Sequence, residues 1–156
     1  MARKTGEALK WIVGILRRYK IPFQIAGGFA AKIYGSKRLL NDIDIDAPDA
    51  RIKDIVPDVK RYVLFGPGRE SKEGFDVYIL TVKYKGEMID ISGCDSGKLF
   101  DSKQRKWIRD RADLSKAVKK KVFGIVVPVI SKEELIKYKR KLKREVDLVD
   151  IRELKE

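Results

Sequence analysis

Three aspartates occupy alternate positions in the segment "NDIDIDA", which spans residues 41–47. Side chains at alternate positions of a β-strand point to the same face, about 6.6 Å apart along the strand axis. Carboxylates of Asp42, Asp44 and Asp46 would therefore repel one another unless a positive charge lies between them. Two interpretations stay open: the face is solvated, or it holds a hard divalent cation such as Mg²⁺ or Mn²⁺.

A third acid for such a site is found in the later segment "EMIDIS" (residues 87–92), where Asp90 has the same apolar–acid–apolar surroundings. Asp76, at the start of the preceding strand, is the main competitor, and Asp95, in a loop, is another. Asp90 is the preferred candidate, although a polar face on a half-buried strand would give the same pattern.

A glycine pair, Gly27-Gly28, lies between a short apolar segment and a second apolar segment of helical character. Glycine lets the backbone approach a ligand closely, and backbone N–H groups at such a turn can bind phosphate. Lys37 and Arg38 follow and could add cationic contacts. The alternative is a tight strand-to-helix turn without a ligand.

The composition limits the chemistry. The chain of 156 residues has no histidine and one cysteine, Cys94. Histidine-dependent catalysis and an internal disulfide are thus excluded, and a metal would need oxygen ligands. The formal net charge of +13 favours a polyanionic partner, namely nucleic acid, nucleotide or an acidic protein. The longest early apolar run, "WIVGIL", is too short to span a bilayer, so a cytoplasmic protein without membrane association is expected. Abundant Lys, Arg, Glu, Ile and Val with few Asn and Gln suit a thermophile.

Apolar periodicity predicts an α/β (α+β) fold, with a mixed β-sheet flanked by helices and a single domain over residues 1–156. Helices are expected at 5–19, 29–34 and 49–59, and strands at 22–26, 41–47, 61–66, 75–84, 87–92 and 123–131. A Gly-rich loop is expected at 66–74. A capping box beginning at Ser131 predicts a C-terminal helical segment over about 131–156, bent before residue 144.

The order of these motifs resembles the nucleotidyltransferase superfamily of DNA polymerase β. In particular, it is similar to small prokaryotic nucleotidyltransferases of the abortive-infection and lincosamide-resistance types. The matching positions are Gly27, Gly28, Ala30, Gly35, Arg38, Leu40, Asp42 and Asp44. Leu40 departs from the family's usual Thr or Ser. The tail "VPVISKEELIKYKRKLKREVDLVDI" is also similar to that of these families, including a helix with a lysine and an Arg-x-x-Asp-x-x-Asp-Ile ending.

The resemblance implies an Mg²⁺-dependent enzyme that transfers a nucleoside monophosphate from an NTP, such as ATP, to a hydroxyl group and releases pyrophosphate. Asp42, Asp44 and Asp90 would hold the metal ions, and Asp90 would also accept the proton of the acceptor hydroxyl. Gly27 and Gly28 would bind the triphosphate. Asp46 is expected at the solvent end of the strand, and the alternative is a carboxylate in the outer shell around the metal. A toxin–antitoxin role with a partner protein, and a homodimer, are further implications.

The acceptor could be an RNA end, a protein or a small molecule, and the net charge favours RNA. The basic segment 98–121 has interleaved aromatic residues and is a candidate acceptor-binding surface, with a solvated helix face as the alternative. Its proposed contacts are Arg105, Lys106, Trp107 and Arg109. Lys139 and Arg144 of the terminal helical segment are weaker candidates for nucleotide contacts. A non-catalytic nucleotide- or RNA-binding module on the same fold is the alternative function.

Overall fold

The structure is a computed structural model that describes residues 3–39, 42–142 and 145–155. Its helices are α1 (Arg3–Arg18), α2 (Gly27–Ile33), α3 (Asp49–Ile52), α4 (Val56–Val59), α5 (Lys132–Leu142) and α6 (Glu145–Lys155). Its strands are β1 (Gln24–Ala26), β2 (Asp42–Ala47), β3 (Val63–Lys72), β4 (Phe75–Tyr84), β5 (Glu87–Gly93), β6 (Gly97–Asp101), β7 (Lys106–Asp110), β8 (Val118–Val122) and β9 (Ile125–Val129).

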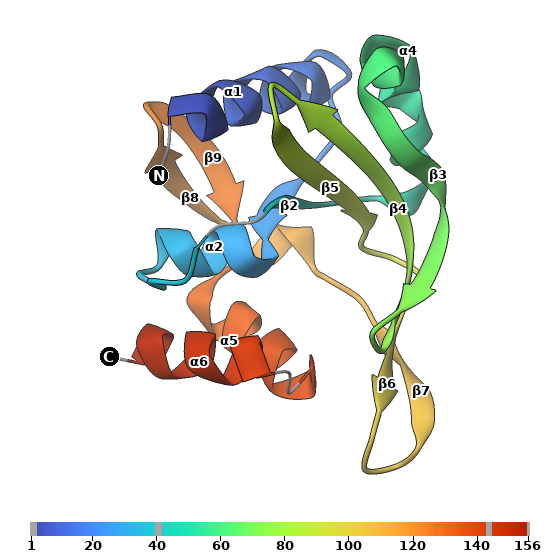
Figure 1. The fold of residues 1–156 in the computed structure, drawn as a ribbon, viewed down its shortest axis with the longest axis vertical. Coiled ribbons are helices and arrows are strands. Elements are labelled where there is room, and N and C mark those ends of the chain that lie inside the picture. Colours follow the sequence, from blue (N-terminus) through green and yellow to red (C-terminus); the bar gives the residue numbers. More distant parts are fainter. Residues whose placement is uncertain (1–2, 40–41, 143–144, 156) are drawn as a thin grey trace.

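The strands form one mixed sheet in the order β7-β6-β4-β5-β2-β1-β9-β8, with β3 added to β4. The β2–β5 and β1–β9 pairs are parallel, and the other pairs are antiparallel. Helix α1 lies on one side of this sheet, whereas α5 and α6 lie together beside α2, away from α1 (Figure 1). The predicted α/β class with a mixed sheet is confirmed.

The central strands are amphipathic in the two-residue period that their sequences predict. Ile43 and Ile45 of β2 and Ile89 of β5 are at most 1% exposed and belong to the same buried cluster as Leu9 and Ile12 of α1. Burying these aliphatic side chains against α1 fixes which face of each strand is apolar. The intervening aspartates must therefore point to the opposite face.

The loop predicted at 66–74 is wrong. Strand β3 continues to Lys72 because its pairing with β4 resumes after register shifts near Phe65 and Gly68. Only Glu73 and Gly74, which both have positive φ, form the turn. The Gly and Pro residues of this segment produce an irregular strand, since cross-strand pairing outweighs their local preference.

The alternative interpretation of segment 98–121 as a solvated helix face is also wrong. This segment contains β6, β7 and β8, with a short 3₁₀ turn at Leu114–Lys116 between β7 and β8. Its strands are short and rich in basic residues, with three consecutive lysines in β8, so their apolar pattern is weak and becomes clear only when the pairing partners are known.

The C-terminal segment begins as the capping box predicts. The backbone N–H of Glu134 donates to Ser131 Oγ at 3.2 Å, which caps the N-terminus of α5. A second helix, α6, then packs on α5. The single-domain organisation stays a prediction.

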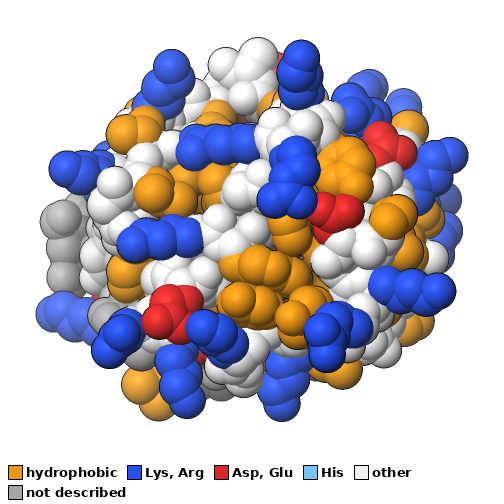
Figure 2. Space-filling model, turned by 90° about the horizontal axis from the view of Figure 1, so that it is seen from above, with side chains coloured by type: hydrophobic (Ala, Val, Ile, Leu, Met, Phe, Trp, Pro, Cys, Tyr) orange, Lys and Arg blue, Asp and Glu red, His pale blue; other side chains and the backbone are white. Residues whose placement is uncertain are grey.

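Lys and Arg side chains are spread over the face that lies above α1, with few Asp and Glu among them (Figure 2). This distribution agrees with the excess of 36 basic over 23 acidic residues. In the described ranges, no helix combines the length and the apolar character that a bilayer crossing requires.

Candidate active site

Strands β2 and β5 bring together the three acids that the sequence singled out. Asp44 lies directly beside Asp90 in the parallel β2–β5 register, and Asp42 lies two residues away on the same face of β2. One carboxylate oxygen from each of Asp42, Asp44 and Asp90 lies within 4.8 Å of the others. An all-oxygen set at this spacing fits Mg²⁺, Mn²⁺ or Ca²⁺, because these hard cations prefer carboxylate ligands.

The carboxylates are held close despite their mutual repulsion, and the pKa values of Asp42 and Asp44 reflect this. Burial raises the pKa of Asp44 to about 7, and the charges of Asp90 and Asp42 raise it as well. Burial and Asp90 also raise the pKa of Asp42. A cation among these groups would relieve the repulsion, so the arrangement is suited to a divalent metal.

The glycine pair contacts this site directly. Gly27 has φ +56°, and a Cβ atom built on it would lie 2.5 Å from Asp44 Oδ2. The backbone N–H of Gly28 donates to the same oxygen at 3.0 Å. Glycine is therefore required at position 27 both for its backbone conformation and for the close approach of Asp44. Binding of a phosphate by this turn stays a prediction.

Thr81 is a member of the site that the sequence analysis missed. Its hydroxyl donates to Asp90 Oδ1 at 2.7 Å and so fixes the orientation of this carboxylate. Lys85-Gly86, between the strands expected at 75–84 and 87–92, is a signal for a two-residue turn that could have found Thr81. Counting back from such a two-residue turn places Thr81 opposite Asp90 in the β4–β5 hairpin.

Asp46 does not lie at the solvent end of its strand, as was expected. It is half-buried and accepts a hydrogen bond from Gln24 Nε2 at 2.9 Å. Burial raises its pKa to about 6, while the contact with Gln24 lowers it. Asp46 is thus part of the interior wall, because strand β1 pairs with β2 at this level.

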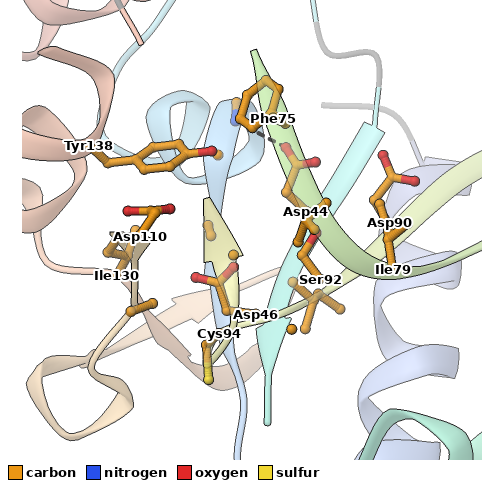
Figure 3. A pocket seen from close by; sticks show the side chains of 18 of the residues that line it. Asp44, Asp46, Phe75, Ile79, Asp90, Ser92, Cys94, Asp110, Ile130 and Tyr138 are labelled. Carbon is orange, nitrogen blue, oxygen red and sulfur yellow. Dashed lines mark hydrogen bonds between the residues drawn. The ribbon is translucent and has the colours of Figure 1, made fainter. Parts of the chain in front are cut away.

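The acids line a cavity of about 700 Å³ between the sheet, the β6–β7 hairpin and α5. Figure 3 shows Asp44 and Asp90 on one side of this cavity, with Asp110 and Tyr138 on the other and Asp46 between the two groups. Burial raises the pKa of Asp110. Asp110 and Tyr138 were not predicted from the sequence, because no local signal shows that β7 and α5 face β2.

The two predicted cations after α2 behave differently. Arg38 lines the cavity, and its guanidinium binds Asp150 through Nε and Nη2 at 2.8 and 2.7 Å. Its Nη2 also lies 3.2 Å from the position that a Cβ atom on Gly28 would occupy. Lys37 is exposed and is absent from the cavity lining, and its backbone N–H donates to Glu153. The structure brings Arg38 to the site and leaves Lys37 outside it.

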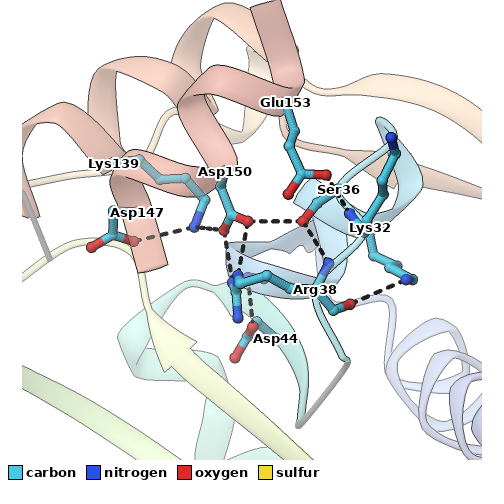
Figure 4. Close-up of polar contacts among 10 residues, drawn as sticks. Lys32, Ser36, Arg38, Asp44, Lys139, Asp147, Asp150 and Glu153 are labelled. Atoms are coloured by element: carbon cyan, nitrogen blue, oxygen red, sulfur yellow. Dashed lines mark hydrogen bonds and ion pairs between the residues drawn. The ribbon is translucent and has the colours of Figure 1, made fainter. Parts of the chain in front are cut away.

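A buried network joins Arg38 to the C-terminal helices (Figure 4). Lys139 of α5 lies 2.9 Å from Asp150 and 3.3 Å from Asp147, and these three residues are at most 1% exposed. Ser36 Oγ donates to Asp150 at 2.8 Å. Burial would raise the pKa of Asp150, but the hydrogen bonds from Arg38, Lys139 and Ser36 lower it to about 2. Lys139, a candidate for a nucleotide contact, is therefore engaged inside the protein.

The predicted acceptor-binding residues lie away from the acids. Arg105 is in the turn of the β6–β7 hairpin, and Lys106, Trp107 and Arg109 are exposed on β7. None of the four lines the cavity. Trp107 and Arg109 are separated from Asp110 by an odd number of positions along β7. Their side chains therefore point to the face of the hairpin opposite to that of Asp110.

The competing acids have other partners. Asp76 binds Arg69 at 2.9 Å, and Asp95 accepts the backbone N–H of Asp49 at 2.9 Å. Cys94 is buried, and burial raises the pKa of its thiol to about 12, in agreement with an inert residue. Leu40 and Arg144 lie outside the described residues.

Comparisons with solved structures identify the fold. TM1012 of Thermotoga maritima, whose nucleotidyltransferase assignment is itself an inference, is 22% identical, with a TM-score of 0.69 over 97% of this chain and 93% of its own. The lincosamide antibiotic adenylyltransferase LnuA, solved with lincomycin, is 17% identical, with a TM-score of 0.62 over 96% and 95%. The antibiotic-resistance factor ANT(2'')-Ia is 16% identical, with a TM-score of 0.63 over 99% and 84%. No protein-family model and no curated protein sequence matches the chain.

Replacing Gly27 by alanine should destabilise the protein by about 1–2 kcal/mol, because a left-handed backbone conformation is costly for alanine. The new Cβ atom should also displace Asp44 and weaken Mn²⁺ binding. Denaturant unfolding and Mn²⁺ titration by calorimetry measure the two effects. Gly14→Ala is the control, since nothing lies within 4 Å of its Cβ position in α1. It should stabilise the protein by about 0.5–1 kcal/mol. Equal behaviour of the two variants would contradict the assigned role of Gly27.

Without a divalent cation, the acidic site should reduce stability as the pH rises. The folded-state pKa of Asp44, about 7, lies above its ordinary value, so the folded protein binds more protons than the unfolded chain between these values. The melting temperature should therefore fall as the pH is raised through 7, and Mg²⁺ should restore it. Asp44→Asn should flatten this pH dependence and abolish most of the Mg²⁺ effect. A wild-type melting temperature that ignores Mg²⁺ at every pH would contradict a cation site.

Asp150→Asn should destabilise the protein by about 3 kcal/mol, because it removes a charge partner from the buried Lys139 and from Arg38. The depressed pKa of Asp150 contributes stability that is present above its ordinary pKa and is lost as the pH falls towards 2. The variant should lack this acid-sensitive component in urea unfolding at a series of pH values. Arg152→Gln, an exposed change on the same helix, should alter stability by less than about 0.5 kcal/mol. A similar loss of stability in both variants would contradict the role of Asp150 in holding Lys139 and Arg38.

Proposed function

The chain has the nucleotidyltransferase fold, and we propose that it is a divalent-metal-dependent nucleotidyltransferase that moves a nucleoside monophosphate from an NTP to a hydroxyl acceptor. One observation carries this proposal: three carboxylates from two strands lie within 4.8 Å of one another beside a glycine turn. LnuA is described as an adenylyltransferase, and a structure of ANT(2'')-Ia contains adenylyl-2''-tobramycin. Both descriptions favour ATP as the donor.

In this proposal, Asp42 and Asp44 hold Mg²⁺ or Mn²⁺, and Asp90 contributes a further carboxylate. When bound, the metal would neutralise the triphosphate and stabilise the charge on the entering and leaving oxygens. The donor set fits this role because all its atoms are carboxylate oxygens. The turn at Gly27 and Gly28 would bind the triphosphate beside Asp44, since a backbone without side chains lets a ligand approach closely.

Asp90 would accept the proton of the acceptor hydroxyl while the hydroxyl oxygen attacks the α-phosphorus. The bond from the α-phosphorus to the bridging oxygen would break, and pyrophosphate would leave. Thr81 is a positioning residue for this step, because its hydroxyl orients the carboxylate of Asp90. Holding the reactants in line supplies most of the acceleration in such a reaction.

The acceptor class stays open among an RNA end, a protein and a small molecule. The cavity of about 700 Å³ is large enough for a nucleotide or a small-molecule acceptor. The antibiotic complexes of LnuA and ANT(2'')-Ia make lincosamides and aminoglycosides reasonable first trials. The abortive-infection subtype, a toxin–antitoxin role and a homodimer stay predictions from the resemblance.

Transfer can be tested with each NTP labelled at the α-phosphate, in the presence of Mg²⁺ or Mn²⁺. The acceptors are total RNA, a cell lysate, lincomycin and tobramycin. Label should move to one acceptor class, and Asp42→Asn and Asp90→Asn should each reduce the rate by at least about 100-fold. The control Asp54→Asn, a surface acid that pairs with Arg51, should retain the rate.

Undiminished transfer in both site variants would refute the assigned roles. Tight NTP binding with no transfer to any acceptor would instead favour the alternative function, a non-catalytic binding module on the same fold.

A further inference from the structure

The β6–β7 hairpin presents an unusual face on the side opposite to Asp110. Lys98 lies directly opposite Arg109, and Phe100 lies directly opposite Trp107. The two pairs are two residues apart along each strand, so their side chains share one face. The hairpin projects from the body of the molecule, beyond the start of β4 (Figure 1).

The aromatic pair on this face is exposed. Phe100 is 41% and Trp107 is 44% exposed, and their rings meet edge to face with centroids 5.6 Å apart. The buried contacts of the hairpin are made on its other face, where Leu99 is opposite Ile108. A cross-strand aromatic pair stabilises a hairpin, but this does not explain the charges beside it.

Lys98 and Arg109 are like charges placed directly opposite each other, an arrangement that destabilises a strand pair. On β4, Asp76 is the register partner of Lys98, but its carboxylate is bound by Arg69 at 2.9 Å. Within the described ranges, neither Lys98 nor Arg109 forms an ion pair. Arg105 adds another positive charge at the hairpin turn. The face therefore bears a positive charge that no described side chain compensates.

We propose that this face, formed by Lys98, Phe100, Trp107 and Arg109, binds single-stranded nucleic acid. The aromatic pair offers a platform on which unpaired bases stack, and the flanking cations bind phosphates. An acidic polypeptide would satisfy the charges, but only nucleic acid offers flat bases for the aromatic pair together with phosphates for the cations beside it, so nucleic acid is the better match. We call this surface the ribbon face.

The ribbon face is continuous with the cavity. Lys98, at its base, also borders the cavity, whereas Trp107 and Arg109 do not. A nucleic-acid strand bound along the hairpin would thus reach the mouth of the cavity at Lys98. The proposal concerns binding only, and it stands whether or not the chain transfers nucleotides.

Fluorescence anisotropy with a short labelled single-stranded RNA tests this proposal on the full chain. The charge variant is Lys98→Glu/Arg109→Glu. Its matched control is Lys119→Glu/Lys121→Glu, which makes the same change in net charge at two exposed lysines of β8. The stacking variant is Phe100→Ala/Trp107→Ala, with Val118→Ala as its control at another exposed apolar residue. Unfolding curves verify that each variant is folded.

The charge variant should bind the RNA at least tenfold more weakly than the wild type. The slope of log affinity against log salt should fall by about 1.4 when two phosphate contacts to a single strand are lost. The stacking variant should lose affinity by about tenfold with little change in this slope. Both controls should stay within about threefold of the wild type.

Several results would overturn the proposal. Equal losses in the charge variant and its control would show that net charge alone attracts RNA. Equal affinity for duplex RNA, or displacement of the RNA by polyglutamate at equal charge concentration, would show that stacking plays no part. Asp44→Asn should bind the RNA as the wild type does even if it loses nucleotide transfer, so failure of the catalytic proposal is distinguishable from failure of this one.

Discussion

The mutual repulsion of Asp42, Asp44 and Asp90 is the constraint around which this structure is organised. Like charges this close persist only where other interactions are strong enough to hold them. Here the hydrogen-bonded β2–β5 register and the buried isoleucines on the opposite face supply those interactions. The same isoleucines pack with α1, so the core of the protein keeps the acids in place. A bound cation would reduce the repulsion among them.

A second set of charges connects the C-terminal helices to this centre. Asp150 binds Arg38 and Lys139, and the guanidinium of Arg38 reaches the vicinity of Gly28. The pairing explains why two cations that a motif comparison would assign to the nucleotide are turned towards the protein instead. A buried lysine is costly without a charged partner, and α6 provides that partner. A shift of α6 would therefore also shift Arg38 and its position beside Gly28.

The distribution of charge differs between the interior and the exterior. The overall charge is +13, and the cavity wall carries both signs: Asp42, Asp44 and Asp90 lie together in it, and Lys and Arg residues also line it. A positive surface attracts a polyanion from solution, whereas the cluster of three aspartates attracts cations. The two features would therefore concentrate polyanions at the surface and a cation at the aspartate cluster.

The sequence by itself determined the amphipathic strands, the glycine turn, the capped C-terminal helix and the identity of the three acids, because each follows from local periodicity or local backbone requirements. It did not locate Asp110 or Tyr138, which reach the cavity only because β7 and α5 lie near β2 in the folded chain. It also missed the pairing of Arg38 with Asp150, which is 112 residues away. It misjudged Asp46, whose environment is set by Gln24 on a neighbouring strand. Only the tertiary structure decided these points, because contact between distant segments depends on how the whole sheet is ordered, and no local pattern records that order.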